Sequence, residues 1–340
     1  QLLGSNGSSP LITVTLYTKE NCSLCKKAER DLRSLQARIP HTLALVDIDK
    51  HAELKAAYAE RVPVLQAGPY TLSAPFTRKK IEATLAAARD RQEQLVGDPK
   101  FKERKARGGQ VTSGDRFSHW WSRNYLALLN LLLFIYVALP VFAPVMMKAG
   151  YPGVARPIYG LYGAVCHQLA FRSWFLFGEQ PIYPRAAAEL EGYQTFQEVT
   201  GIDESDPRSL LAARSFVGNE QVGYKVAFCQ RDIAIYGAML GFGLLFAATG
   251  RRLRPLPWWL WVLIGIAPIA LDGFSQLLSQ FPGFSWWVYR ESTPLLRTLT
   301  GALFGFTTAW YGFPLLEESM AETRLTVVSK KARLAAKEKA

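Results

Sequence analysis

The chain has 340 residues, 49% of them hydrophobic, with 40 Lys and Arg against 28 Asp and Glu, a formal net charge of +12 and only 4 Cys. This length accommodates two domains, and the hydropathy is uneven, because the first third is polar and long apolar runs follow Asn124. The basic residues cluster beside the apolar runs without interleaved stacking aromatics, which argues against a nucleic-acid-binding protein and favours a protein of the lipid bilayer.

The first clear pattern is LITVTLYT from Leu11, which alternates as a buried strand does, followed by NCSLC and by the helical stretch KKAERDLRSLQARI. Cys22 is therefore expected at a helix N-terminus. There the free N–H groups, the helix dipole and the neighbouring Lys26 and Lys27 should lower its pKa below the free value of about 8.5. Cys25, one turn further on, is placed to resolve a mixed disulfide.

The next segments complete an α/β domain that we assign to residues 11–93. HTLALVDID predicts a strand, AELKAAYAER a helix, VPVLQA with YTLSA a hairpin, and the stretch from Phe76 to about Glu93 a final helix. The order β-α-β-α-β-β-α fits a sheet with right-handed crossovers.

Three features, the strand–CxxC–helix unit, VDID and RVPVL, make residues 11–90 resemble the glutaredoxin-like branch of the thioredoxin superfamily. The resemblance implies a cis peptide bond before Pro63, which packs beside the CxxC, and a Val62 backbone that meets a disulfide-bonded partner. It also implies that Cys22 is the nucleophile and Cys25 the resolving thiol.

Two alternatives stay open for this domain. Glutathione-using members carry a Gly-Gly-Asp-like segment where this chain has QAGPYTLSAPFT, so the partner is either a thiol or disulfide protein or a small thiol. The CxxC is also compatible with half of a zinc site, for which His41 and His51 are the candidate ligands.

Residues 94–123 form a basic, polar linker that we expect on the cytoplasmic surface, with HWWSRN at the membrane boundary. Within a membrane domain of residues 124–316, four segments are long enough to cross the bilayer: 124–147, 230–249, 257–280 and 294–316. The resulting fold class is an α/β thioredoxin-like domain followed by an α-helical transmembrane bundle.

Charge orients this bundle. The RRLR turn at 251–254 and the basic tail 317–340 both read as cytoplasmic, so the segment 154–178, interrupted by polar residues, is predicted to be a re-entrant or interfacial helix and not a fifth span. The acidic stretch 179–228 then forms an extracytoplasmic cap. We expect a multi-pass protein of the cytoplasmic (inner) membrane with both termini in the cytoplasm.

Polar residues converge at the outer side of this bundle, and Asp272 lies within the third span. A charge at such depth costs about 2.5–3.5 kcal/mol, so it needs a partner, and Arg231 and Arg297 are the expected counter-ions. The segments CHQLAFRS and CQRDIAIYG resemble a family of uncharacterised bacterial multi-pass membrane proteins with a Cys-His-Gln motif. The second candidate site comprises Cys166, His167, Gln168, Arg172, Cys229, Arg231, Asp232, Asp272 and Arg297.

Several chemistries fit this second site, and no cofactor is assigned. Cys166 and Cys229 form a disulfide if their Cα atoms lie within about 7 Å. Together with His167 and Asp232 they bind a metal ion if Cys166 and His167 lie on an irregular turn. The arginines and Asp272 alternatively bind a quinone or a lipid headgroup, or the cysteines are simply buried small residues.

The leading hypothesis is a membrane-anchored thiol–disulfide oxidoreductase that uses the CxxC dithiol and relays electrons to the membrane site near Cys166 and Cys229. The alternatives are a non-catalytic accessory or scaffold subunit of a larger membrane complex, and a metal- or lipid-headgroup-binding membrane protein.

Overall fold

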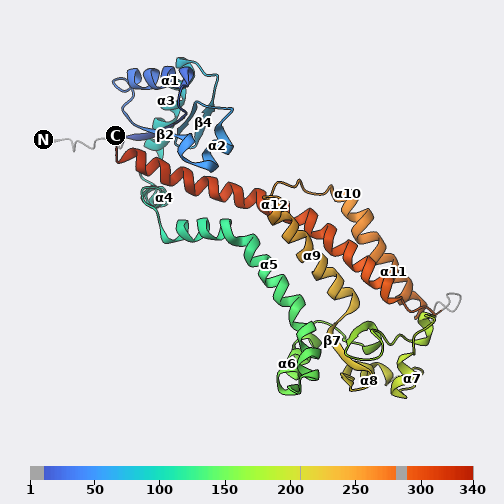
Figure 1. Ribbon diagram of the computed structural model, residues 1–340. Coiled ribbons are helices and arrows are strands. Elements are labelled where there is room, and N and C mark those ends of the chain that lie inside the picture. Colours follow the sequence, from blue (N-terminus) through green and yellow to red (C-terminus); the bar gives the residue numbers. More distant parts are fainter. Residues whose placement is uncertain (1–10, 207, 281–288, 340) are drawn as a thin grey trace. The chain divides into compact units, whose positions relative to one another are not determined.

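The structure is a computed structural model and describes residues 11–206, 208–280 and 289–339. The chain divides into two compact units, Gln1–Asn124 with Glu318–Ala340, and Tyr125–Glu317. Helices α5 (Ser113–Lys148) and α12 (Pro294–Lys337) contribute residues to both units; Figure 1 labels the α-helices and some of the strands.

The first unit contains a four-stranded sheet in the order β2-β1-β3-β4. Strand β1 pairs in parallel with β2 and antiparallel with β3, and β3 and β4 form an antiparallel hairpin. The predicted order of elements and the α/β thioredoxin-like fold class are confirmed. The elements are β1 (Ile12–Thr18), α1 (Ser23–Leu35), β2 (His41–Asp47), η1 (Ile48–Lys50), α2 (Ala52–Tyr58), β3 (Val64–Ala67), β4 (Tyr70–Ser73) and α3 (Arg78–Leu95).

Sequence periodicity explains how α1 packs on this sheet. The helix buries Cys25, Ala28, Leu32 and Leu35, which recur every three or four residues and so share one face. Ala28, Leu32 and Leu35 of this face join Val14 and Leu16 of β1 in the core. The apolar face therefore fixes the side of α1 that meets the sheet and the position of the CxxC at its start.

The predicted linker and tail are largely helical and belong to the first unit. The linker range 94–123 holds α4 (Pro99–Gly108) and the start of α5, and the tail is the end of α12. Val328 and Ala332 of α12 share a buried cluster with Tyr17 and Cys25 of the N-terminal α/β fold.

The second unit combines long helices with a small three-stranded antiparallel sheet in the order β5-β7-β6. Besides parts of α5 and α12, its elements are α6 (Pro152–Gly163), η2 (Ala170–Arg172), β5 (Ser173–Leu176), η3 (Ala186–Ala188), α7 (Phe196–Thr200), α8 (Ser209–Ser215), β6 (Gly218–Asn219), β7 (Gly223–Cys229), α9 (Gln230–Ala248), α10 (Trp258–Leu260), η4 (Trp261–Ile266) and α11 (Ala267–Ser279).

The prediction of one helix over 154–178 is wrong beyond its first half. Helix α6 ends at Gly163, the chain turns through Gln168 at φ +51°, and β5 follows. A residue with this left-handed backbone conformation cannot continue a right-handed α-helix. The chain after it forms β5, which pairs with β7. Strand β5 precedes residue 179, whereas β6 and β7 follow it. The sheet therefore includes residues on both sides of the boundary that we predicted for the cap, 179–228.

Among the described residues, three helical stretches are long and apolar enough to cross a membrane: Ser113–Lys148, Gln230–Ala248 and Trp258–Ser279. They match three of the four predicted spans. The fourth, 294–316, lies in α12 and remains a prediction as a membrane crossing. Its Gly301 and Gly305 face α9, and a Cβ at Gly305 would overlap the backbone of Ile235, so the two helices are in close contact there.

Candidate functional site

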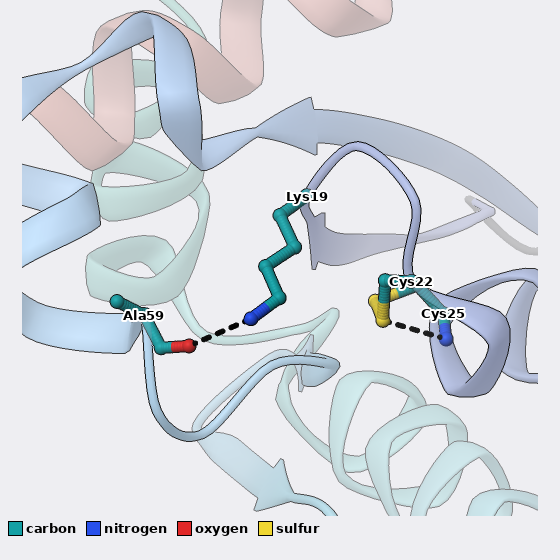
Figure 2. Close-up of a disulfide and its surroundings, with 4 residues drawn as sticks. All are labelled: Lys19, Cys22, Cys25 and Ala59. Carbon is teal, nitrogen blue, oxygen red and sulfur yellow. Dashed lines mark hydrogen bonds between the residues drawn. A yellow bond between two sulfur atoms is a disulfide. The ribbon is translucent and has the colours of Figure 1, made fainter.

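Cys22 and Cys25 form a disulfide at the start of α1, with their Cα atoms 5.2 Å apart (Figure 2). Cys22 is the N-cap of the helix, and its Sγ accepts a hydrogen bond from the Cys25 N–H at 3.1 Å. Cys25 is buried, whereas Cys22 is partly exposed. A thiolate released at Cys22 on reduction would therefore have a backbone donor and the helix dipole to stabilise it.

The surroundings of the disulfide match the predicted architecture in part. The Val62–Pro63 peptide bond is cis, and Val62 shares a buried cluster with Cys25. The Val62 N–H donates to the Tyr58 carbonyl at 3.0 Å, and the contact of the Val62 backbone with a partner remains a prediction. Figure 2 shows the Lys19 ammonium donating to the Ala59 carbonyl, at 3.3 Å, and not to a sulfur.

The zinc alternative for the CxxC finds no support in this geometry. The two sulfurs are bonded to each other, and His41 is buried with Nδ1 2.7 Å from the Ile39 carbonyl oxygen. Among the residues that the structure describes, the cluster with metal-ligand spacing lies in the second unit.

That cluster consists of Cys166, Cys229 and Asp232, whose ligand atoms all lie within 4.8 Å of one another. Cys166 lies on the turn after α6, Cys229 is the N-cap of α9, and Asp232 is in the first turn of α9. The Cys229 Sγ donates to Asp232 Oδ2 at 3.0 Å. Both cysteines are free thiols.

The two thiols ionise unequally. A hydrogen bond with Cys229 lowers the pKa of the Cys166 thiol, and Cys166 also accepts from the Gln168 N–H at 3.4 Å. The same hydrogen bond, together with burial and the nearby Asp232 carboxylate, raises the pKa of the Cys229 thiol well above its ordinary value. Cys166 is therefore the first of the pair to lose its proton.

A cavity of about 270 Å³ brings most of the predicted second site together. Asp272 does not line it but pairs with Arg231, which does. His167 is exposed and lines the cavity without joining the three-residue ligand cluster. The predicted residues that line it are Cys166, His167, Gln168, Arg172, Cys229, Arg231, Asp232 and Arg297.

Gln168 has a positioning role. Its side-chain amide donates to the carbonyls of Tyr159 at 2.9 Å and Ala227 at 2.7 Å, which ties the Cys166 turn to α6 and to β7. The Gln168 carbonyl accepts from Lys225, a fully buried residue that the sequence pattern does not single out.

Two buried carboxylates organise the arginines beside the cavity. Glu291 forms a bidentate pair with Arg172 at 2.7 and 3.0 Å and a second ion pair with Arg297. Asp272 pairs with Arg231 and with Arg290, the latter at 2.9 Å.

The predicted pairing of Asp272 is thus half right. Arg231 is its counter-ion, but Arg297 pairs with Glu291, and Arg290 takes its place. The sequence signal for Arg290 is the stretch Arg-Glu-Ser at 290–292, which places a charged pair just before an apolar helix. Ser292 also donates a hydrogen bond to Asp272.

Two family models match the chain, one in each half. Residues 13–86 match the model of a glutaredoxin-like domain (DUF836), and residues 211–311 match that of a predicted membrane protein family (DUF2085). An uncharacterized protein of Methanocaldococcus jannaschii is 26% identical over 165 residues, which cover 47% of this chain and 69% of that protein. No solved structure matches the chain. The chain thus joins an N-terminal glutaredoxin-like domain to a C-terminal membrane-protein domain.

Proposed function

We propose that the protein is a membrane-anchored thiol–disulfide oxidoreductase whose working pair is Cys22 and Cys25. The observation that carries this proposal is the position of the disulfide: Cys22 is partly exposed at the N-cap of α1, and Cys25 is buried behind it. An accessible sulfur at a helix N-terminus with a second sulfur one turn away is the arrangement that thiol–disulfide exchange requires.

The exchange proceeds in two steps from the reduced dithiol. The Cys22 thiolate attacks a disulfide sulfur of the partner, so that a mixed disulfide forms and the partner's other sulfur leaves as a thiolate, which takes up a proton. The Cys25 thiolate then attacks Cys22 and releases the second partner thiol. The partner disulfide gains two electrons and two protons, and Cys22–Cys25 becomes the disulfide seen here.

The reducing equivalents come from a thiol, either a protein dithiol or two molecules of a small thiol, which reverse the same two steps. Val62 shares a buried cluster with Cys25 and precedes the cis peptide bond to Pro63, and in this proposal the two residues shape the surface on which the partner docks. Cys22, Cys25 and Pro63 are therefore the proposed exchange site, with the cytoplasmic membrane as the proposed location.

A relay from this pair to Cys166 and Cys229 has weaker support. These two sulfurs are not bonded to each other, and their neighbours differ in kind from those of the CxxC, because a carboxylate accepts from Cys229.

Trapping of the mixed disulfide tests the proposal. In a Cys166→Ser, Cys229→Ser background, the Cys25→Ser variant should accumulate a covalent adduct with a disulfide substrate, because Cys22 attacks but nothing resolves the product. The matched Cys22→Ser variant should form none. Equal adduct in both variants, or none in either while the protein is folded, would refute the proposed roles.

A further inference from the structure

The cluster of Cys166, Cys229 and Asp232 has the composition and spacing of a metal-binding site. Its three ligand atoms lie within 4.8 Å of one another and come from two separate segments, the turn after α6 and the start of α9. Cys229 and Asp232 are three residues apart at the helix start, so their side chains share one face. Contributions from both segments mean that an ion here would join them.

The position of each ligand is set by groups around it. Cys166 is 8% exposed, and its sulfur accepts the Gln168 N–H, a contact of the kind that supports metal-bound thiolates. The Gln168 side chain in turn holds the turn to Tyr159 and Ala227 through two carbonyls. Because these supporting bonds are already present, the ligands need little rearrangement to close around an ion.

We propose that Cys166, Cys229 and Asp232 bind a divalent cation of the zinc class, with a fourth coordination position open to the cavity. Two thiolates and one carboxylate suit a borderline-soft ion and do not suit magnesium or calcium, which take oxygen ligands. Three protein ligands with one open position are typical of zinc sites that act on a bound molecule. The adjoining volume of about 270 Å³ accommodates water or a small anion in that position.

The charges around the site favour this occupancy. Two thiolates and a carboxylate carry three negative charges, so the complex with a divalent ion carries a net charge of −1. Beside it, four guanidiniums face two buried carboxylates, which leaves an excess of positive charge; the pairs are Arg172 and Arg297 with Glu291, and Arg231 and Arg290 with Asp272. The arginines therefore stabilise the anionic complex and would attract an anion to the open position.

The bonding of this cluster differs from that of the CxxC pair. In one structure, Cys22 and Cys25 are bonded while Cys166 and Cys229 remain free thiols. Cys229 donates to the carboxylate of Asp232, the third ligand of the proposed site. Metal binding at this cluster is independent of the exchange activity proposed for Cys22 and Cys25.

Co²⁺ provides the test. When thiolates bind Co²⁺, the complex has a thiolate-to-cobalt charge-transfer band that complexes without thiolate ligands lack. The full chain would be purified anaerobically in detergent as a Cys22→Ser, Cys25→Ser variant, which removes the other pair of thiols, and titrated with Co²⁺. We expect one cobalt per chain with a thiolate-to-cobalt charge-transfer band, which Zn²⁺ abolishes by displacement.

Variants then identify the ligands. Cys166→Ser or Cys229→Ser should lose most of the band, and Asp232→Asn, which keeps the shape of the side chain, should weaken Co²⁺ binding by at least about 10-fold. Asp203→Asn, at an exposed aspartate of the same unit, serves as the control and should bind as before. A folded parent protein without the band, or a band that survives both cysteine substitutions, would overturn the proposal.

Discussion

Two buried carboxylates, Asp272 and Glu291, determine how the polar end of the membrane domain is held together. Each has a side chain that is at most 2% exposed, and each is bound by two guanidiniums. An isolated carboxylate would be costly at such a position, whereas one with two counter-ions and further hydrogen bonds is stable. These residues therefore connect the starts of α9 and α12 to α11 and to η2.

Asp272→Asn should destabilise the second unit strongly. The substitution leaves Arg231 and Arg290 without their shared carboxylate, and breaking a buried ion pair by removing one partner costs about 3–5 kcal/mol. Unfolding by denaturant in detergent would measure this. Glu220→Gln, at the exposed pair with Lys148, is the control and should change stability by less than about 1 kcal/mol. Similar effects of the two substitutions would contradict the assigned role of Asp272.

Lys225 should make stability depend on pH. Burial lowers the pKa of Lys225 to about 7, against an ordinary value of 10.5. Between these two values the unfolded state binds more protons than the folded state, so the free energy of unfolding should rise with pH across the window. Below the window Lys225 is charged in both states, and its contribution no longer changes with pH. Lys225→Met should remove that rise when unfolding is measured on both sides of pH 7. An unchanged pH dependence would show that Lys225 stays charged in the folded protein.

At the scale of elements, the contact between α9 and α12 depends on glycine. Gly301 and Gly305 are one helical turn apart on α12 and admit the α9 backbone, whereas Gly312 on the same helix has open space around it.

Gly305→Ala should therefore destabilise the helix pair by about 1–3 kcal/mol, because the added methyl group overlaps the Ile235 backbone. Gly312→Ala should be neutral or stabilise by up to about 1 kcal/mol through helix propensity. Thermal unfolding in detergent distinguishes the two; equal melting temperatures would mean that the helices are not in close contact at Gly305.

Local pattern suffices to predict the α/β fold of residues 11–93. The alternation in β1 and the three- and four-residue spacing in α1 are short-range signals, and together they place Cys22 at a helix start. The segment after Gly163 could not be predicted in this way. Its turn depends on hydrogen bonds from Gln168 to Tyr159 and Ala227, and the last of these lies 59 residues away in sequence.

The candidate site shows the same division between local and distant signals. Residue type and depth identify Asp272 as needing a counter-ion, but the choice of Arg290 over Arg297 depends on how helices separated in sequence pack. The cavity brings together eight of the predicted residues, because charged and thiol side chains in apolar surroundings stand out in the sequence whatever the fold.

At the scale of the whole molecule, the first unit constrains how often the chain crosses the membrane. This unit contains both the residues that lead into α5 and the end of α12, where Lys330 bonds to Asp115 at 2.6 Å. We therefore expect the chain to leave one side of the membrane and return to it, which needs an even number of crossings. Three helical stretches among the described residues meet the criteria for a span, so we expect α12 to be the fourth.

Labelling of single cysteines tests this topology. In a chain with all four native cysteines replaced by serine, Lys100→Cys and Lys339→Cys should both resist a membrane-impermeant maleimide in intact cells. Glu189→Cys, in the predicted extracytoplasmic cap, should react. Labelling at only one of positions 100 and 339 would show an odd number of crossings. Labelling at both of these positions but not at position 189 would show that the orientation is the opposite of the predicted one.

The proposed exchange activity depends most on the ionisation of Cys22, and the pH dependence of its alkylation tests that directly. The rate would be followed in the full chain with Cys25, Cys166 and Cys229 replaced by serine, so that one thiol remains. The N-cap position predicts a pKa clearly below the free value of about 8.5, and the native pair should reduce a disulfide substrate. A midpoint at the free value, with no reduction of the substrate by the native pair, would contradict the proposed function.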